Sequence, residues 1–155
     1  MLLPWFQAIE ASSLGEAIRN SLWLFPIIEA FHLVGLAVIG GAVLVVDFRM
    51  LGLTLRSHPV SRLARDVQPL VVGALVVMIA SGVPLFVSEA IKCYYSFAFW
   101  TKMTALALAI VFTFTIRRSV SLSDNSEAPW NKIVAGTSIA LWATVGWGGR
   151  WIGFS

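Results

Sequence analysis

Four apolar stretches, each about as long as a membrane-spanning helix, constrain this 155-residue chain more than any other feature. An α-helix rises 1.5 Å per residue, so about 20 residues cross the roughly 30 Å hydrocarbon core of a bilayer. The stretches cover residues 22–46, 69–91, 97–116 and 133–152. The segments between them are short and leave no room for a soluble domain. We therefore predict an all-α integral membrane four-helix bundle that forms a single domain.

The composition agrees with a membrane protein. Hydrophobic residues make up 58% of the chain and charged residues only 12%, against about 25% charged residues in an average soluble domain. The net charge of +3 is small, and the arginines do not cluster with aromatic residues as a nucleic-acid surface requires. We expect the lipid bilayer as a partner and no nucleic acid. The single cysteine, Cys93, excludes an internal disulfide and a Cys-x-x-Cys-His haem attachment.

Basic residues are unevenly distributed about the four stretches. One set of ends carries Arg49, Arg56, Arg62, Arg65, Arg117, Arg118 and Lys132. The other set carries Arg19, Lys92, Lys102 and Arg150. Because basic residues favour the cytoplasmic side, the first set predicts the cytoplasmic face. Both termini would then be periplasmic, with the protein in a bacterial inner membrane.

The segment before the first stretch has an amphipathic pattern. Apolar side chains at Trp5, Phe6 and Ile9 alternate with polar ones at Gln7 and Glu10. This pattern predicts a short helix over residues 5–18 that lies in the membrane interface. The first residues lack the basic segment of a signal peptide, so we expect this helix to be retained.

Small residues recur every four positions along the last stretch, at Gly136, Ala140, Thr144 and Gly148. Such a seam lets another helix approach closely. Either a neighbouring span or a second copy of the chain can fill it, so a homodimer or a larger membrane complex stands beside a monomer as an alternative. We also expect Pro69 and Asn131 at helix starts, where proline and capping residues are favoured.

An ionisable pair, Glu29 and His32, lies inside the first stretch, one helical turn apart. Such groups are costly within a membrane and usually mark a site. His32 is about ten residues from the end of its span, hence roughly 15 Å deep. If Glu29 orients one ring nitrogen, the other becomes a metal ligand or proton acceptor. The alternative is a neutral buried histidine that is bonded only to Glu29 or to the backbone.

Other polar residues fall at the same level of the predicted bundle. They are Glu89, Lys92, Lys102 and Arg150. We predict one outer-leaflet cluster that is shared by all four spans. In it, Lys102 and Arg150 would neutralise an anionic cofactor or a quinone headgroup, for instance the propionates of haem. Pairing of Lys102 with Glu29 or Glu89, and snorkelling of Lys92 and Arg150 to the headgroups, are the structural alternatives.

Few residues near His32 in the predicted bundle could act as metal ligands. A di-iron bundle needs two Glu-x-x-His motifs, and catalytic zinc needs about three protein ligands. His58 falls in a loop on the opposite side from His32. A haem b would therefore be bound by His32 alone, by His32 with Met78 or Met103, or by His32 from two protomers. A packing role is the alternative for Met78.

The end of the first stretch reads Asp47-Phe-Arg49-Met-Leu-Gly52. Asp47 and Arg49 could pair with Arg65 and Asp66 across the following loop. We favour instead that Asp47 and Arg49 anchor the helix end at the lipid headgroups.

Several short motifs carry a family resemblance: Glu29-Ala-Phe-His32-Leu-Val-Gly35, Asp47-Phe-Arg49-Met-Leu-Gly52, Phe99-Trp-Thr-Lys102 and Gly149-Arg150-Trp-Ile. With them the chain resembles a family of small bacterial four-helix membrane proteins of unknown function. More distantly it is similar to the haem-binding four-helix cytochrome b group and the copper resistance protein D family. This resemblance implies an inner-membrane bundle with haem b or quinone-linked electron transfer. Only His32 carries over as an axial ligand, because the paired histidines of the cytochromes are missing.

Three functional hypotheses follow. The first is a cofactor-binding or electron-transfer subunit, rather than an enzyme, with His32 as ligand and Glu29 orienting it. The second is a proton or small-solute transport component that uses Glu29, His32, Glu89 and Lys102. The third is a structural or assembly subunit whose polar cluster fixes the helix packing.

Overall fold

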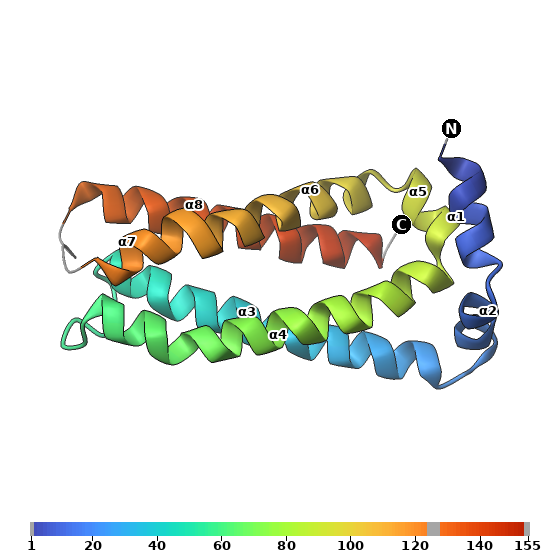
Figure 1. The fold of residues 1–155 in the computed structure, drawn as a ribbon, viewed down its shortest axis with the longest axis horizontal. Helices are drawn as coiled ribbons and strands as arrows, with labels where there is room; N and C mark the ends of the chain where they lie inside the picture. The colour runs from blue at the N-terminus through green and yellow to red at the C-terminus, as the bar shows by residue number, and fades with distance from the viewer. Residues whose placement is uncertain (1, 124–127, 154–155) are drawn as a thin grey trace.

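Four long helical segments run side by side along the molecule (Figure 1). They are α3 (Leu24–Met50), α4 (Val60–Ser88), α6 (Phe97–Phe112) with its continuation through η1 (Thr113–Arg117) and α7 (Arg118–Leu122), and α8 (Pro129–Ile152). The computed structural model describes residues 2–123 and 128–153. Within these residues α3 packs along α4, α6 along α8, and α3 also contacts α8. No strand occurs in these ranges, so the predicted all-α class is confirmed.

Three helices of the described chain are long and apolar enough to cross a membrane: Leu24–Met50, Val60–Ser88 and Phe97–Leu122. The fourth predicted span corresponds to α8, which has 24 residues but is less apolar. Lys132 lies in its first turn and Arg150 in its last. In Figure 1, α8 nevertheless extends alongside α6 over the length of the bundle.

Three predicted helix boundaries are wrong. The second span begins at Val60 rather than at Pro69, which lies inside α4. Residues before Pro69 continue the helix because Leu63 and Val67 pack against the apolar core, while the proline lacks only one N–H donor. The third span continues to Leu122, through residues that we predicted to be a loop. Asn131 is not a cap but a buried residue within the first turn of α8.

The predicted interfacial helix is two helices, α1 (Leu3–Glu10) and α2 (Ser13–Asn20). The chain breaks between them because Ser12 has an extended backbone and its hydroxyl accepts a hydrogen bond from the Gly15 N–H, at 3.3 Å. Both helices lie across one end of the bundle, α1 against α5 (Ala90–Tyr95) and α2 against α4 (Figure 1). We call this the N-terminal end of the bundle.

Hydrogen bonds hold α1 and α2 against that end. The Arg19 guanidinium donates to the carbonyl of Ser88, at 2.9 Å, and to the carbonyl of Glu10, at 2.8 Å. The Glu10 carboxylate accepts from the Ile91 N–H at the start of α5, at 2.6 Å. The N-terminal helices are therefore fixed to α4 and α5 by polar contacts as well as by packing.

The core of the bundle is apolar over its middle third. Ile39, Val43 and Val145 are completely buried there, together with Met78 and Trp142. The buried face of α8 differs from the predicted small-residue seam. Gly148 packs against α6, whereas Gly136, Ala140 and Thr144 are exposed.

Candidate functional site

Three polar side chains from three helices meet in the half of the bundle nearer the N-terminal end. The His32 ring of α3 lies between Ser81 of α4 and Lys102 of α6. Its Nδ1 atom is 2.9 Å from the Ser81 Oγ, and its Nε2 atom is 3.5 Å from the Lys102 Nζ. We call these three residues the His32 site.

The hydrogen bonds of Ser81 determine the protonation of the histidine ring. The Ser81 hydroxyl donates to the carbonyl of Val77, at 2.6 Å, so its oxygen is left to accept from His32. The proton of a neutral His32 therefore lies on Nδ1, and the lone pair of Nε2 faces the Lys102 ammonium. Both ring nitrogens of His32 are engaged by protein groups.

Glycines of two helices make room for this site. A Cβ atom at Gly82 would lie 3.2 Å from the His32 ring. At Gly148 it would lie 2.9 Å from the Cβ of Lys102, and at Gly149 it would lie 3.3 Å from the Lys102 Nζ. The Lys102 side chain thus lies along the glycine pair of α8, so all four long segments contribute to the site.

Lys102 has hydrogen-bonding capacity to spare. An ammonium group has three N–H donors. Within residues 2–123 and 128–153, the structure gives Lys102 one hydrogen-bond partner, the His32 Nε2. The site can therefore offer donors to an additional acceptor, such as a carbonyl or a carboxylate oxygen.

The predicted contact between Glu29 and His32 is absent from the described residues. Glu29 is exposed on the outer side of α3, while His32 points toward α4 and is half-buried. Residues three apart on a helix differ by about 60° in direction, which here is enough to separate the two side chains. Ser81 takes the orienting role that we assigned to Glu29. Nothing in the sequence around Ser81, beyond its position beside Gly82, indicated this contact.

Among the described residues, His32 receives no side-chain hydrogen bond from Glu89, Met78 or Met103. Glu89 pairs with Lys92, 3.9 Å away, and both are partly exposed at the N-terminal end. Arg150 is exposed near the end of α8. Met78 is buried in the apolar core, as the packing alternative predicted, and Met103 is exposed. His58 lies in the exposed α3–α4 connection at the opposite end of the bundle, where its carbonyl accepts from Arg49.

Cys93 is buried in α5, close to the same end. Burial, with a smaller contribution from the charge of Glu89, raises the pKa of the Cys93 thiol to about 11.

At pH 8 we expect iodoacetamide to alkylate Cys93 in the folded protein about a hundred times more slowly than it alkylates an ordinary exposed cysteine, since only the thiolate reacts. The rate should rise as the pH approaches 11. Mass spectrometry of the intact chain measures it, because Cys93 is the single cysteine. The SDS-denatured protein is the control, and equal rates in both states would contradict the prediction.

A second polar cluster lies at the opposite end of the bundle and was not predicted. The Asp47 carboxylate accepts from the Arg117 Nε at 2.7 Å, and both side chains are buried, at 0% and 7% exposed. The Arg117 Nη2 also donates to the carbonyl of Val43, at 3.0 Å. Asp47 therefore pairs with an arginine of the third span and does not anchor a helix end at the headgroups. The second carboxylate oxygen of Asp47 and the Ser138 hydroxyl are buried without a partner among the described residues.

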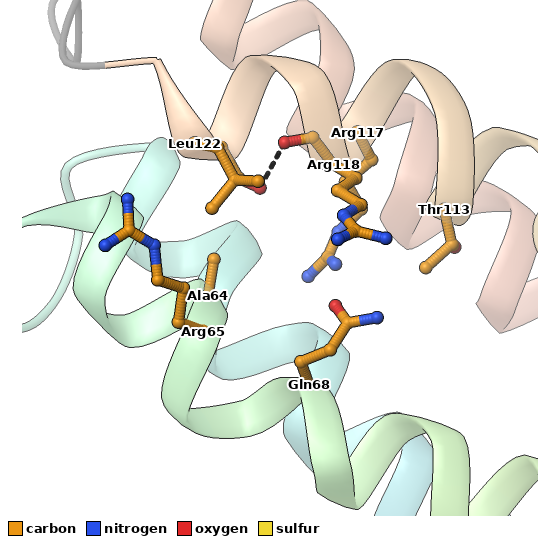
Figure 2. A pocket seen from close by; sticks show the side chains of 8 residues that line it. Ala64, Arg65, Gln68, Thr113, Arg117, Arg118 and Leu122 are labelled. Atoms are coloured by element: carbon orange, nitrogen blue, oxygen red, sulfur yellow. Dashed lines mark hydrogen bonds between the residues drawn. The ribbon is translucent and has the colours of Figure 1, made fainter.

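A cavity of about 130 Å³ adjoins this ion pair, between α4 and the η1–α7 segment (Figure 2). Its polar lining comprises Arg65, Gln68, Thr113, Arg117, Arg118 and Ser121. Figure 2 shows the guanidinium groups of Arg117 and Arg118 directed toward Gln68 across the cavity. The π-helical turn η1 ends at Arg117, and such turns are frequent at functional sites.

The described residues contain no group of three or more His, Cys, Asp or Glu side chains that could hold a metal ion.

Sequence comparison places the chain in a family. Residues 5–155 match the family of unknown function DUF6644, which is nearly the whole chain. The chain belongs to DUF6644. It matches no curated protein and no solved structure. The predicted membership in a family of unknown function is thereby confirmed, while the more distant likeness to cytochrome b and copper resistance proteins stays an expectation.

Membership in DUF6644 covers all four long segments and both polar clusters. The family has no known function. The two clusters lie at opposite ends of one apolar core and offer different groups. The His32 site offers an ammonium and an imidazole, whereas the cluster around Asp47 and Arg117 offers guanidinium groups.

Proposed function

We propose that this DUF6644 member is a quinone-binding subunit of the bacterial inner membrane, with the headgroup site at Lys102 and His32. The observation that carries the proposal is the half-buried Lys102 ammonium, 3.5 Å from the His32 Nε2 and with further donors unused by the described residues. A quinone presents carbonyl oxygens, which accept hydrogen bonds, and a partly desolvated ammonium is a strong donor. The ring of His32 holds the ammonium in place.

A groove for the isoprenoid tail supports the same ligand. An open, mainly apolar hollow of about 490 Å³ lies between α6 and α8. It extends from Phe97 to Leu108 on α6 and includes Thr101, the neighbour of Lys102. The Thr101 hydroxyl donates to the Phe97 carbonyl, so it adds little polarity to the groove. Lys102 itself does not line this hollow, because neighbouring residues on a helix differ by about 100° in direction, so the tail would have to pass around the side of α6 to reach it.

The proposed topology has four crossings, with α8 as the fourth. α8 lies beside α6 through the bundle, and its charged residues are near its two ends. The basic residues of the α3–α4 connection and of η1 and α7 favour that end as cytoplasmic. In this orientation the N-terminal end is periplasmic, and the His32 site belongs to the outer leaflet.

Haem b does not fit the His32 site as it stands. An axial ligand needs a free imidazole lone pair, but Nε2 faces Lys102 and Nδ1 is bonded to Ser81. Met78, the predicted second ligand, is packed in the apolar core. Iron would have to displace one of these two contacts of the ring.

A transport path is less well supported than a binding site. Ile39, Val43 and Val145 are completely buried between the two polar clusters, and they offer no group that could relay a proton or bind a solute. A purely structural role of the His32 site is the remaining alternative. It predicts that substitutions alter stability without altering ligand binding.

Replacing Lys102 by methionine should weaken quinone binding by about 10- to 100-fold, because a hydrogen bond from a charged donor contributes about 1.5–3 kcal/mol. The measurement is quenching of tryptophan fluorescence by a benzoquinone with a decyl tail, in detergent or nanodiscs. Trp100, Trp147 and Trp151 lie on the parts of α6 and α8 nearest the site and report binding. Methionine keeps the length of the side chain and removes its charge.

The matched control is Lys92→Met, which removes the same charge from an exposed position on α5. Equal quinone affinities for the wild type and both variants would refute the proposal and leave the structural role. A Soret absorbance band in the purified protein that disappears in His32→Ala would favour haem instead.

A further inference from the structure

We propose a second binding site, for a phosphate group, in the cavity between α4 and the η1–α7 segment at the opposite end from α1 and α2. Its volume of about 130 Å³ is several times that needed for a single water. Three arginines line it: Arg65 from α4, Arg117 from η1 and Arg118 from α7. Planar guanidinium groups match the oxygens of a phosphate better than any other side chain.

The ion pair with Asp47 positions Arg117 for this role. The Nε of Arg117 is bonded to Asp47 and its Nη2 to the carbonyl of Val43. Its Nη1 group, with two further N–H donors, has no partner among the described residues. Because the side chain is fixed from the α3 side, presenting these donors to the cavity costs little conformational entropy.

The charge of the cavity is positive. Asp47 neutralises Arg117, but neither Arg65 nor Arg118 has an ion pair in the part of the chain that the structure describes. Asp66 follows Arg65 on α4, is exposed and does not line the cavity. Gln68 and Thr113 add neutral groups that can donate to phosphate oxygens. An anion is therefore the expected occupant.

The cavity lies at the position along the bundle where a lipid headgroup is expected. Gln68 immediately precedes the apolar part of α4, and Arg117 follows the apolar part of the third span. Both residues thus lie near a boundary of the apolar region. The phosphate could come from an anionic lipid or from a small phosphorylated solute, since both present the same oxygens.

Arg118→Gln and Arg65→Gln should each weaken phosphate binding by about tenfold, in keeping with the loss of a charged hydrogen bond. In one arm, the full-length protein in phosphatidylcholine nanodiscs is titrated with inorganic phosphate by calorimetry. In the other, native mass spectrometry counts the phosphatidylglycerol retained after exposure to mixed phosphatidylcholine and phosphatidylglycerol micelles. Arg117 is left unchanged because its removal would expose the buried Asp47.

Arg62→Gln is the control, since Arg62 is exposed on α4 and does not line the cavity. Loss of inorganic phosphate binding in the cavity variants, but not in Arg62→Gln, would support a solute site. The corresponding loss of phosphatidylglycerol would support a lipid site. If Arg65→Gln and Arg118→Gln behave like Arg62→Gln in both arms, with unchanged helicity and unfolding temperature, the proposal is wrong.

Discussion

Replacing Asp47 by leucine should lower the free energy of unfolding by about 3–5 kcal/mol, which is the cost of leaving a buried charge without its partner. Arg117 would keep only its bond to the carbonyl of Val43, in a place where its side chain is 7% exposed. Unfolding in detergent by increasing SDS, followed by tryptophan fluorescence, measures the change. We expect this to be the largest effect of any single substitution considered for this chain.

The double variant Asp47→Leu with Arg117→Leu separates the ion pair from the packing around it. Apolar residues in place of a buried pair are often neutral, so the double variant should recover most of the lost stability. Arg118→Gln, at an exposed position on the next residue, should change the stability by less than about 0.5 kcal/mol. A double variant no more stable than Asp47→Leu alone would show that the pair is not the source of the effect.

Gly148→Val should destabilise the contact between α6 and α8 by about 1–3 kcal/mol, as expected for overpacking. A Cβ atom at Gly148 would approach the Cβ of Lys102 to 2.9 Å and the carbonyl of Ala98 to 3.3 Å. Neither atom can move without shifting the backbone of α6. The same SDS unfolding experiment measures the loss.

Gly146→Val provides the matched comparison on the same helix. A Cβ atom at Gly146 has no neighbour within 4 Å, so the substitution changes helix propensity without a clash. We expect it to be neutral or slightly stabilising. If both valine variants unfold at the same SDS fraction, close approach of α6 and α8 at Gly148 does not contribute to stability.

The class and the long helices could be predicted because apolar segments of membrane length leave few alternatives. The positions of the helix ends could not be predicted. Residues 61–68 and 118–122 are polar enough to resemble loops, yet they continue helices because one face of each packs against the bundle. The break at Ser12 depends on one side-chain cap, which a periodic pattern does not reveal.

The sequence predicted that Lys102 and His32 share one end of the bundle, and the structure brings them together. It did not predict Ser81 as the partner of His32, because the rotation of α4 relative to α3 decides which residue faces the ring. Asp47 and Arg117 are 70 residues apart, and Arg117 was assigned to a loop. Pairing between residues so far apart in the sequence is determined by how the helices pack. The sequence around each residue does not reveal it.

The π-helical turn η1 affects which side chains of the third span face the bundle. Ala105, Ala109, Thr113, Arg117 and Ser121 are all buried and follow one another at four-residue intervals. In a regular α-helix each such step turns the side chain by about 40°, so the last members of this series would rotate out toward the lipid. The wider turn contains more residues and offsets part of this drift. One continuous helix can thereby face the apolar core with its first half and deliver a charged guanidinium to α3 with its second.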